Sequence, residues 1–198
     1  MPLLSRPRAR SLAGLIATVL VAVGLAIAIQ AWVVKPYRIP TGSMEPTLVP
    51  HQRLLVNRIF KSLHIGQIVV FHPPEGAASE RCGRPHPATM ACDWPNPESN
   101  QTYIKRIVAG RGDVIAIQDG HVIRNGHREA DRYTRPCFPG EAACTFATPI
   151  QVPRGMWFVM GDNRGDSDDS RFWGPVPASW IIGDAFFTYW PPDRIGTL

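Results

Sequence analysis

The sequence predicts a mainly β protein: an antiparallel β-sheet domain that follows one N-terminal transmembrane helix. The 198 residues include 20 prolines and 17 glycines, which are many for a helical bundle and favour strands joined by turns. After residue 50, short runs of β-branched and aromatic residues recur between glycine and proline turn signals. The apolar residues before this region are instead concentrated in one long N-terminal run.

That run covers residues 12–34 and contains only two polar residues. As a helix it would span roughly 34 Å, enough to cross the hydrocarbon core of a bilayer. It is too long for the apolar region of a cleaved signal peptide, and no clear small-x-small cleavage site ends it. Trp32 and Lys35 suit an interfacial position. We therefore expect an uncleaved signal-anchor, with residues 1–11 in the cytoplasm.

The formal net charge of +5 does not indicate nucleic-acid binding. Arg6, Arg8 and Arg10 supply much of the excess, and their place before an apolar run is typical of membrane topology. The chain has no zinc-finger spacing, basic helix or aromatic-basic motif, so we expect no nucleic-acid partner.

The four cysteines form two local pairs, Cys82 with Cys92 and Cys137 with Cys144. This spacing favours two small disulfide loops and hence an oxidising compartment outside the cytoplasm. A zinc site is the weaker alternative, because Cys-x-x-Cys pairs are missing.

The strands are predicted from short apolar runs and the turns that bound them. The dipeptide Asp119-Gly120 is the strongest hairpin signal. The segments 75–100 and 128–149 are rich in small, polar and proline residues and are predicted to be loop insertions. The expected strands cover residues 53–60, 66–71, 102–108, 114–118, 121–124, 155–160 and 180–190.

Ser43 is the candidate nucleophile, in a segment bounded by Pro40 and Pro46. A serine in such a segment is usually a turn residue, and its hydroxyl needs a base to become nucleophilic. None of the six histidines lies in a segment that suits a base, but Lys105 lies within an apolar strand. Burial lowers the pKa of a lysine. To act as a base near neutral pH, a lysine needs a pKa roughly three units below its ordinary value, a difference that corresponds to about 4 kcal/mol. A lysine that snorkels from an edge strand is the alternative.

The segment 161–174 is dense in aspartates and arginines. Its spacing differs from a calcium-binding EF-hand loop, and its arginines would compete with a cation. An Asp–Arg network that fixes a turn is the favoured interpretation, and no metal is expected.

Three motifs in this order resemble bacterial type I signal peptidases, the Ser/Lys peptidases of family S26. The first is Ser43-Met44-x-Pro46-Thr47-Leu48, and the second is Lys105-Arg106-Ile-Val-x-Gly110-x-Gly112-Asp113. The third runs from Gly161-Asp162-Asn163-Arg164 through Ser167, Asp169-Ser170-Arg171 and Trp173-Gly174 to Val176-Pro177.

The resemblance implies that Ser43 is the nucleophile and Lys105 the general base, with Ser167 orienting the lysine. The hydroxyl of Thr41 and the backbone N–H of Ser43 would form the oxyanion hole. The supporting residues would be Asp169 with Arg171, and Asp162 and Arg164 nearby. The residues proposed to contact the substrate are Ile39, Met44, Val69, Ile104 and Val108.

The implied activity is cleavage of signal peptides from secretory preproteins after small residues of the Ala-x-Ala type, through an acyl-enzyme and without a cofactor. The protein would be single-pass in the plasma membrane, with its catalytic domain on the extracytoplasmic side and close to the secretion translocon. The catalytic β core would comprise residues 35–113 and 152–198, with residues 114–151 as a small second β region.

Two alternatives remain from the sequence. One is a related conjugation-type peptidase that matures a single pilin substrate. The other is a membrane-tethered β module that binds peptides without catalysis, for which Ser43 and Lys105 would not both be needed.

Overall fold

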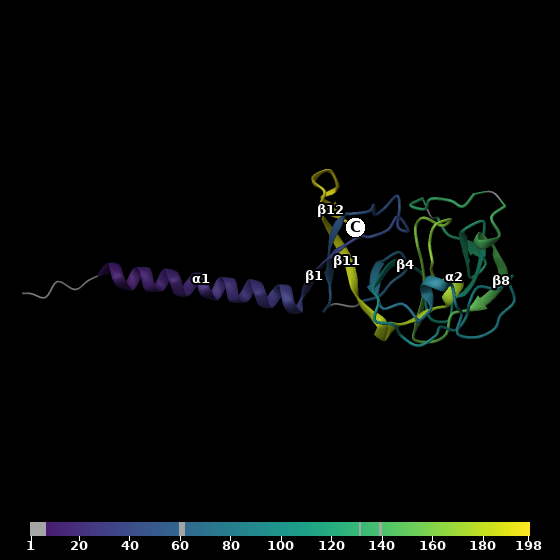
Figure 1. The fold of residues 1–198 in the computed structure, drawn as a ribbon, viewed down its shortest axis with the longest axis horizontal. Helices are drawn as coiled ribbons and strands as arrows, with labels where there is room; N and C mark the ends of the chain where they lie inside the picture. Colours follow the sequence, from purple (N-terminus) through teal and green to yellow (C-terminus); the bar gives the residue numbers. More distant parts are fainter. Residues whose placement is uncertain (1–6, 60–61, 131, 139) are drawn as a thin grey trace, which may run out of the picture.

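The computed structural model describes residues 7–59, 62–130, 132–138 and 140–198. Helix α1 (Pro7–Trp32) extends away from a β domain that contains the rest of the described chain (Figure 1). It ends two residues before the predicted boundary, because Val34 already pairs with Asn57 at the start of the first strand. Among the described residues, no helix has the length and apolar character needed to cross a membrane. Part of the predicted N-terminal segment, residues 1–6, lies outside the described residues.

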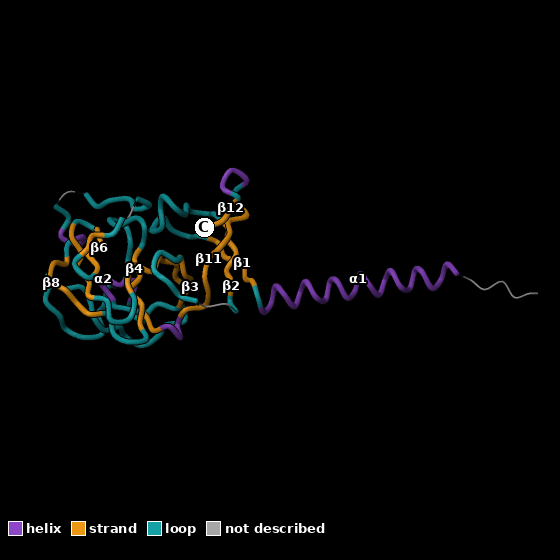
Figure 2. The backbone as a smooth tube through the Cα atoms, turned by 180° about the vertical axis from the view of Figure 1, so that it is seen from behind, coloured by secondary structure: helices purple, strands orange, loops and turns teal. Residues whose placement is uncertain are grey.

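The larger of two sheets has eight strands, and its pairings are antiparallel, so the prediction of a mainly antiparallel β domain is confirmed (Figure 2). Its strand order is β1-β2-β11-β3-β4-β9-β10, with β12 paired to β11. The strands are β1 (Val34–Arg38), β2 (Arg53–Asn57), β3 (Ile68–Phe71), β4 (Tyr103–Ala109), β9 (Met156–Met160), β10 (Val176–Pro177), β11 (Ile181–Trp190) and β12 (Gly196–Thr197).

The second sheet has the order β7-β6-β5-β8. Its strands are β5 (Val114–Gln118), β6 (His121–Arg124), β7 (His127–Arg128) and β8 (Phe146–Gln151). Asp119 and Gly120 join β5 to β6 with φ values of 51° and 79°, the left-handed conformation that a two-residue hairpin turn requires. Strand β8 begins inside the segment predicted to be a loop up to residue 149. It forms because it pairs with β5 and buries Phe146 and Ile150, a long-range gain that local composition does not reveal.

The helical elements of the β domain are short. They are α2 (Ser170–Trp173) and the 3₁₀ turns η1 (Ala77–Ser79), η2 (Ala142–Cys144), η3 (Ala178–Trp180) and η4 (Pro192–Arg194). Helix α2 was not predicted. It is only four residues long, and Asp169 caps it by accepting a hydrogen bond from the backbone N–H of Arg171.

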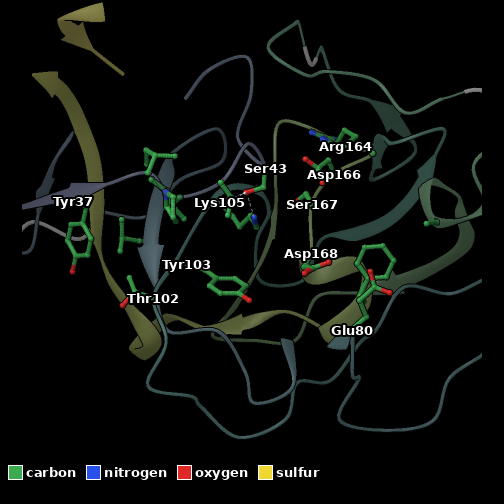
Figure 3. Close-up of a pocket in the computed structure, with 18 of the residues that line it drawn as sticks. Tyr37, Ser43, Glu80, Thr102, Tyr103, Lys105, Arg164, Asp166, Ser167 and Asp168 are labelled. Atoms are coloured by element: carbon green, nitrogen blue, oxygen red, sulfur yellow. Dashed lines mark hydrogen bonds between the residues drawn. The ribbon is translucent and has the colours of Figure 1, made fainter. Parts of the chain in front are cut away.

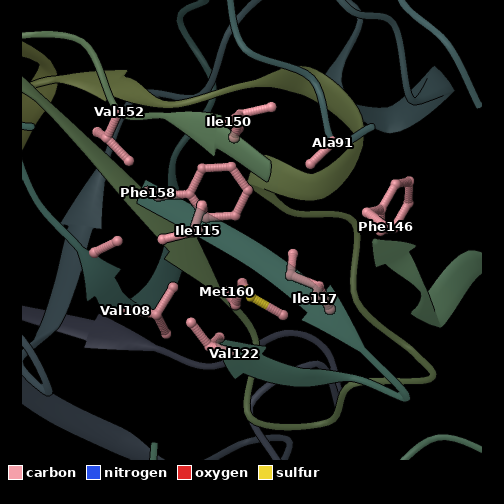
Figure 4. Packing of buried hydrophobic residues seen from close by; sticks show 11 residues of the cluster. Ala91, Val108, Ile115, Ile117, Val122, Phe146, Ile150, Val152, Phe158 and Met160 are labelled. Atoms are coloured by element: carbon pink, nitrogen blue, oxygen red, sulfur yellow. The ribbon is translucent and has the colours of Figure 1, made fainter. Parts of the chain in front are cut away.

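Apolar side chains of the two sheets meet in a shared core (Figure 4). Burial of each large aliphatic or aromatic side chain stabilises the fold by about 1.5–3 kcal/mol relative to exposure. This core therefore fixes β4 and β9, the strands that lead into two of the sequence motifs. Its buried members are Ala91, Val108, Ala109, Ile115, Ile117, Val122, Phe146, Ile150, Val152, Phe158 and Met160.

Disulfides Cys82–Cys92 and Cys137–Cys144 staple the two insertions, as the cysteine spacing predicts. All four cysteines are paired, which rules out the alternative of a four-cysteine zinc site. The first insertion is also attached to the domain, because the backbone N–H of Cys92 donates to the carbonyl oxygen of Arg171 at 2.9 Å.

Candidate functional site

Ser43 and Lys105 meet in the structure, although 62 residues separate them in the chain (Figure 3). Lys105 Nζ donates a hydrogen bond to Ser43 Oγ at 2.7 Å. Lys105 projects from the middle of β4, whereas Ser43 lies in the turn that follows β1. Asn163 fixes this turn, since its backbone N–H donates to the Ser43 carbonyl at 3.1 Å and its side chain donates to Gly42 O at 3.1 Å.

Lys105 is 4% exposed, and its burial lowers its pKa to about 8. The carboxylates of Asp169 and Asp168 oppose this fall by favouring the charged amine, while Arg171 adds to it. A lysine with this pKa has a substantial neutral fraction at mildly alkaline pH, so it can accept a proton from the hydroxyl it contacts. The alternative of a snorkelling lysine is wrong, because the side chain is buried.

Two further hydroxyls lie beside this pair. Thr41 Oγ1 is 3.4 Å from Ser43 Oγ. Ser167 is 8% exposed and lines the same cavity as Lys105, but its Oγ has no hydrogen-bond partner among the described residues. The expected contact from Ser167 to the lysine is therefore not formed in this structure.

Gly161 allows the Ser167 and Ser43 segments to approach each other. A Cβ at Gly161 would lie 2.2 Å from Ser167 Oγ and 2.4 Å from the Ser43 carbonyl oxygen. Both distances are far below van der Waals contact, so any side chain at Gly161 would push these segments apart.

Asp169 and Arg171 form the predicted ion pair, with Arg171 Nε 2.8 Å from Asp169 Oδ1. Burial acts to raise the pKa of Asp169, but the charge and hydrogen bonds of Arg171 and the charge of Lys105 outweigh it and hold that pKa below its usual range. Asp169 also accepts from the backbone N–H of Gly161 at 3.0 Å. The pair thus fixes the turn that carries Ser167.

Asp162, for which the sequence predicted no partner, pairs with Arg106. Its carboxylate accepts from Arg106 Nε at 2.9 Å and from Arg106 Nη2 at 2.7 Å, and Thr47 Oγ1 donates to it at 2.5 Å. This network joins the three sequence motifs. Arg164 instead donates to the backbone carbonyls of Gly161 and Gly120. Sequence reasoning missed Arg106 as a supporting residue, although it directly follows the lysine in the second motif.

A cavity of about 530 Å³ contains the Ser43–Lys105 pair. Of the predicted substrate contacts, Ile39 and Ile104 line this cavity. Met44, Val69 and Val108 do not line it and are fully buried in the core, so their contact with the substrate stays a prediction. In β3, side chains alternate between the two faces, and Val70 lines the cavity while its neighbour Val69 packs on the other side.

The second insertion brings Cys137, Glu141 and Cys144 close together. This cluster is not suited to a metal, because the disulfide removes both thiolates that would act as ligands.

Comparison with known proteins assigns the family. Residues 12–190 match the model of the signal peptidase family, peptidase S26. A signal peptidase I from Leptolyngbya laminosa is 35% identical over 201 residues, covering 100% of this chain and 89% of that protein. A probable signal peptidase I-1 from a Synechocystis strain is 34% identical over 182 residues, covering 90% of this chain and 83% of that protein.

The chain belongs to the signal peptidase family, peptidase S26. A crystal structure of a signal peptidase I from Enterococcus faecalis is 24% identical and has a TM-score of 0.38, covering 63% of this chain and 97% of that one. That structural similarity is too low to bear on function.

Proposed function

We propose that this protein is a serine endopeptidase that cleaves N-terminal signal peptides from secreted preproteins. The observation that carries this proposal is the 2.7 Å contact between Ser43 Oγ and a buried lysine, inside a cavity large enough for an extended peptide. Membership of the signal peptidase family supports the substrate class.

In the proposed reaction, neutral Lys105 removes the hydroxyl proton of Ser43 as Ser43 Oγ attacks the scissile carbonyl carbon. The protonated lysine then donates that proton to the leaving amine as the peptide bond breaks, which leaves an acyl-enzyme. Water, deprotonated by the same lysine, attacks the ester and releases the signal peptide. The lysine returns the proton to Ser43 Oγ.

The oxyanion that develops in both steps would be stabilised by the backbone N–H of Ser43 and the hydroxyl of Thr41. Thr41 Oγ1 lies close to Ser43 Oγ and is exposed to the cavity, which supports this role. Ser167 is proposed to orient Lys105. Its Oγ has no other partner among the described residues, and Ser167 lines the same cavity as Lys105, which supports this role.

Specificity for small residues before the scissile bond would come from apolar residues of the cavity. Ile39, Val70 and Ile104 line the cavity and would contact small apolar side chains of the substrate. Larger side chains would have to displace residues that already pack against the core.

The apolar segment 12–34, of which α1 covers residues 12–32, is proposed as a single-pass membrane anchor that leaves the β domain on the extracytoplasmic side of the plasma membrane, although α1 by itself does not meet the requirement for a membrane span. Large apolar side chains between Leu12 and Ile27 are 50–69% exposed, a pattern that suits lipid better than water. The two disulfides support an oxidising compartment for the β domain. The bilayer and the region near the secretion translocon are therefore the proposed surroundings, because preproteins emerge there.

The test is processing of a preprotein by the full-length enzyme in detergent or proteoliposomes. Ser43→Ala and Lys105→Ala should each reduce the cleavage rate by at least about 10³-fold, because the nucleophile or its base is lost. Ser62→Ala, at an exposed serine distant in sequence from the motifs, is the matched control and should cleave normally. Labelling of Ser43 by an acylating inhibitor would separate a peptidase from a peptide-binding module. Wild-type cleavage in either dyad variant would refute the assignment.

A further inference from the structure

Both disulfide-stapled insertions reach the cavity that contains Ser43 and Lys105. Glu80, which follows η1 in the first insertion, lines the cavity, and so does Glu141 from the second. Neither segment belongs to the three motifs, and neither was expected to touch the site. The insertions therefore form part of the wall of the cleft.

The two ends of the cavity differ in chemistry. Tyr37, at the end of β1, lies on one side of the Ser43–Lys105 pair, and Asp168 and Glu80 lie on the other (Figure 3). The lining near Tyr37 includes Arg38, Ile39 and Thr102 and has no carboxyl group among its described residues. The opposite end carries the carboxyl groups of Glu80, Asp166 and Asp168, with Arg164 near Asp166 (Figure 3), and Glu141 also lines the cavity.

The acidic end has unused hydrogen-bonding capacity. Glu141 Oε2 and Ser167 Oγ are both buried and have no hydrogen-bond partner in the described part of the chain. Ser167 is 8% exposed, and its Oγ is proposed above to orient Lys105. The acidic end of the cavity therefore holds acceptor atoms that no described residue satisfies.

Glu80 and Asp168 line the same part of the cavity (Figure 3). Burial, followed by the charge of Asp168 and a hydrogen bond to it, raises the pKa of Glu80. Arg171 is the basic group that opposes this rise, but its guanidinium is engaged by Asp169 and by the carbonyls of Arg164 and Ser167. Two carboxyl groups in the same part of a cavity favour a cation near them.

The direction of the substrate follows from the position of α1, and this step rests on the proposed function. Strand β1 follows α1 directly, so the Tyr37 end of the cavity is the one joined to the membrane anchor. A preprotein whose signal segment lies in the bilayer would enter at that end. The residues that follow the scissile bond would then lie at the acidic end.

We propose that Glu80 and Asp168 form a subsite that selects a lysine or arginine among the first residues of the mature protein. Ion pairs at partly exposed carboxylates are modest, so the expected preference is roughly fivefold in kcat/KM for lysine over glutamate. Screening by salt should weaken this preference.

The test uses the full-length enzyme and a set of otherwise identical preproteins that carry Lys, Ala or Glu at each of the first four mature positions. At one or more positions, the wild type should have a higher kcat/KM for the lysine preprotein than for the glutamate preprotein. Glu80→Gln and Asp168→Asn should each bring the ratio of these two kcat/KM values toward one. Glu75→Gln, an exposed change in the same insertion, is the control and should keep the wild-type ratio. Thermal unfolding of each variant checks its fold. If Asp168→Asn is destabilised, the ratio measured for Glu80→Gln, a change at an exposed residue, decides the outcome.

A wild-type ratio of one at all four positions, or an unchanged ratio in folded Glu80→Gln, would overturn the subsite. Failure of the proposed function has a different signature, because the wild type would then cleave none of the preproteins, including those with alanine.

Discussion

Replacement of Lys105 by methionine should stabilise the folded protein while abolishing cleavage. Lys105 is 4% exposed, and burial lowers its pKa from 10.5 to about 8. At about 1.4 kcal/mol per pH unit, holding a protonated lysine there costs about 3 kcal/mol. Replacement by methionine removes this cost and so stabilises the folded protein. It also removes the hydrogen bond from Lys105 to Ser43, which lowers this stabilisation by about 1 kcal/mol. The free energy of unfolding should therefore rise by about 2 kcal/mol at neutral pH.

The sign of the pH dependence is specific. Between pH 8 and 10.5 the unfolded chain binds the lysine proton and the folded chain does not, so wild-type stability increases with pH in this window. The methionine variant has no such proton to bind. The difference in free energy of unfolding between the variant and the wild type should therefore be largest below pH 8. It should fall below about 1 kcal/mol by pH 9.5.

Urea unfolding of the full-length protein in detergent micelles, followed by tryptophan fluorescence, measures this difference at pH 7 and 9.5. Lys35→Met changes an exposed lysine and should alter the free energy of unfolding by no more than about 0.5 kcal/mol. A variant at Lys105 that is less stable than the wild type at pH 7, or a gain that is the same at both pH values, would contradict the reasoning.

Two other predictions concern the same site. The kcat/KM for preprotein cleavage should rise with pH and level off above about 8, because the neutral form of Lys105 is the base; a rate that does not change between pH 6 and 8 would exclude this role. Asp162→Asn should lower the free energy of unfolding by about 3 kcal/mol, because it leaves the charge of Arg106 in a largely buried position without its carboxylate. The more exposed pair of Arg84 with Asp93 provides the control, and Asp93→Asn should cost about 1 kcal/mol or less in the same denaturation measurement.

Several features of the fold could be read from local sequence. The strand of Lys105 and the Asp119-Gly120 hairpin are marked by apolar runs and turn residues, and these signals depend on a few neighbouring positions. Strand β8 could not be predicted in this way. Its residues become a strand through pairing with β5 and burial of two side chains, both of which depend on distant parts of the chain.

The sequence by itself identified the serine, the lysine and the cysteine pairs, because residue type and motif spacing are local properties. Only the tertiary structure decided that Val70 and not Val69 faces the cavity, since a shift of one residue along a strand exchanges its two faces. It also decided that Asp162 pairs with Arg106, and that Glu80 lines the cavity that contains the dyad. These contacts join segments far apart in the chain, and no periodic pattern in a loop indicates where its side chains will lie once the sheets have packed.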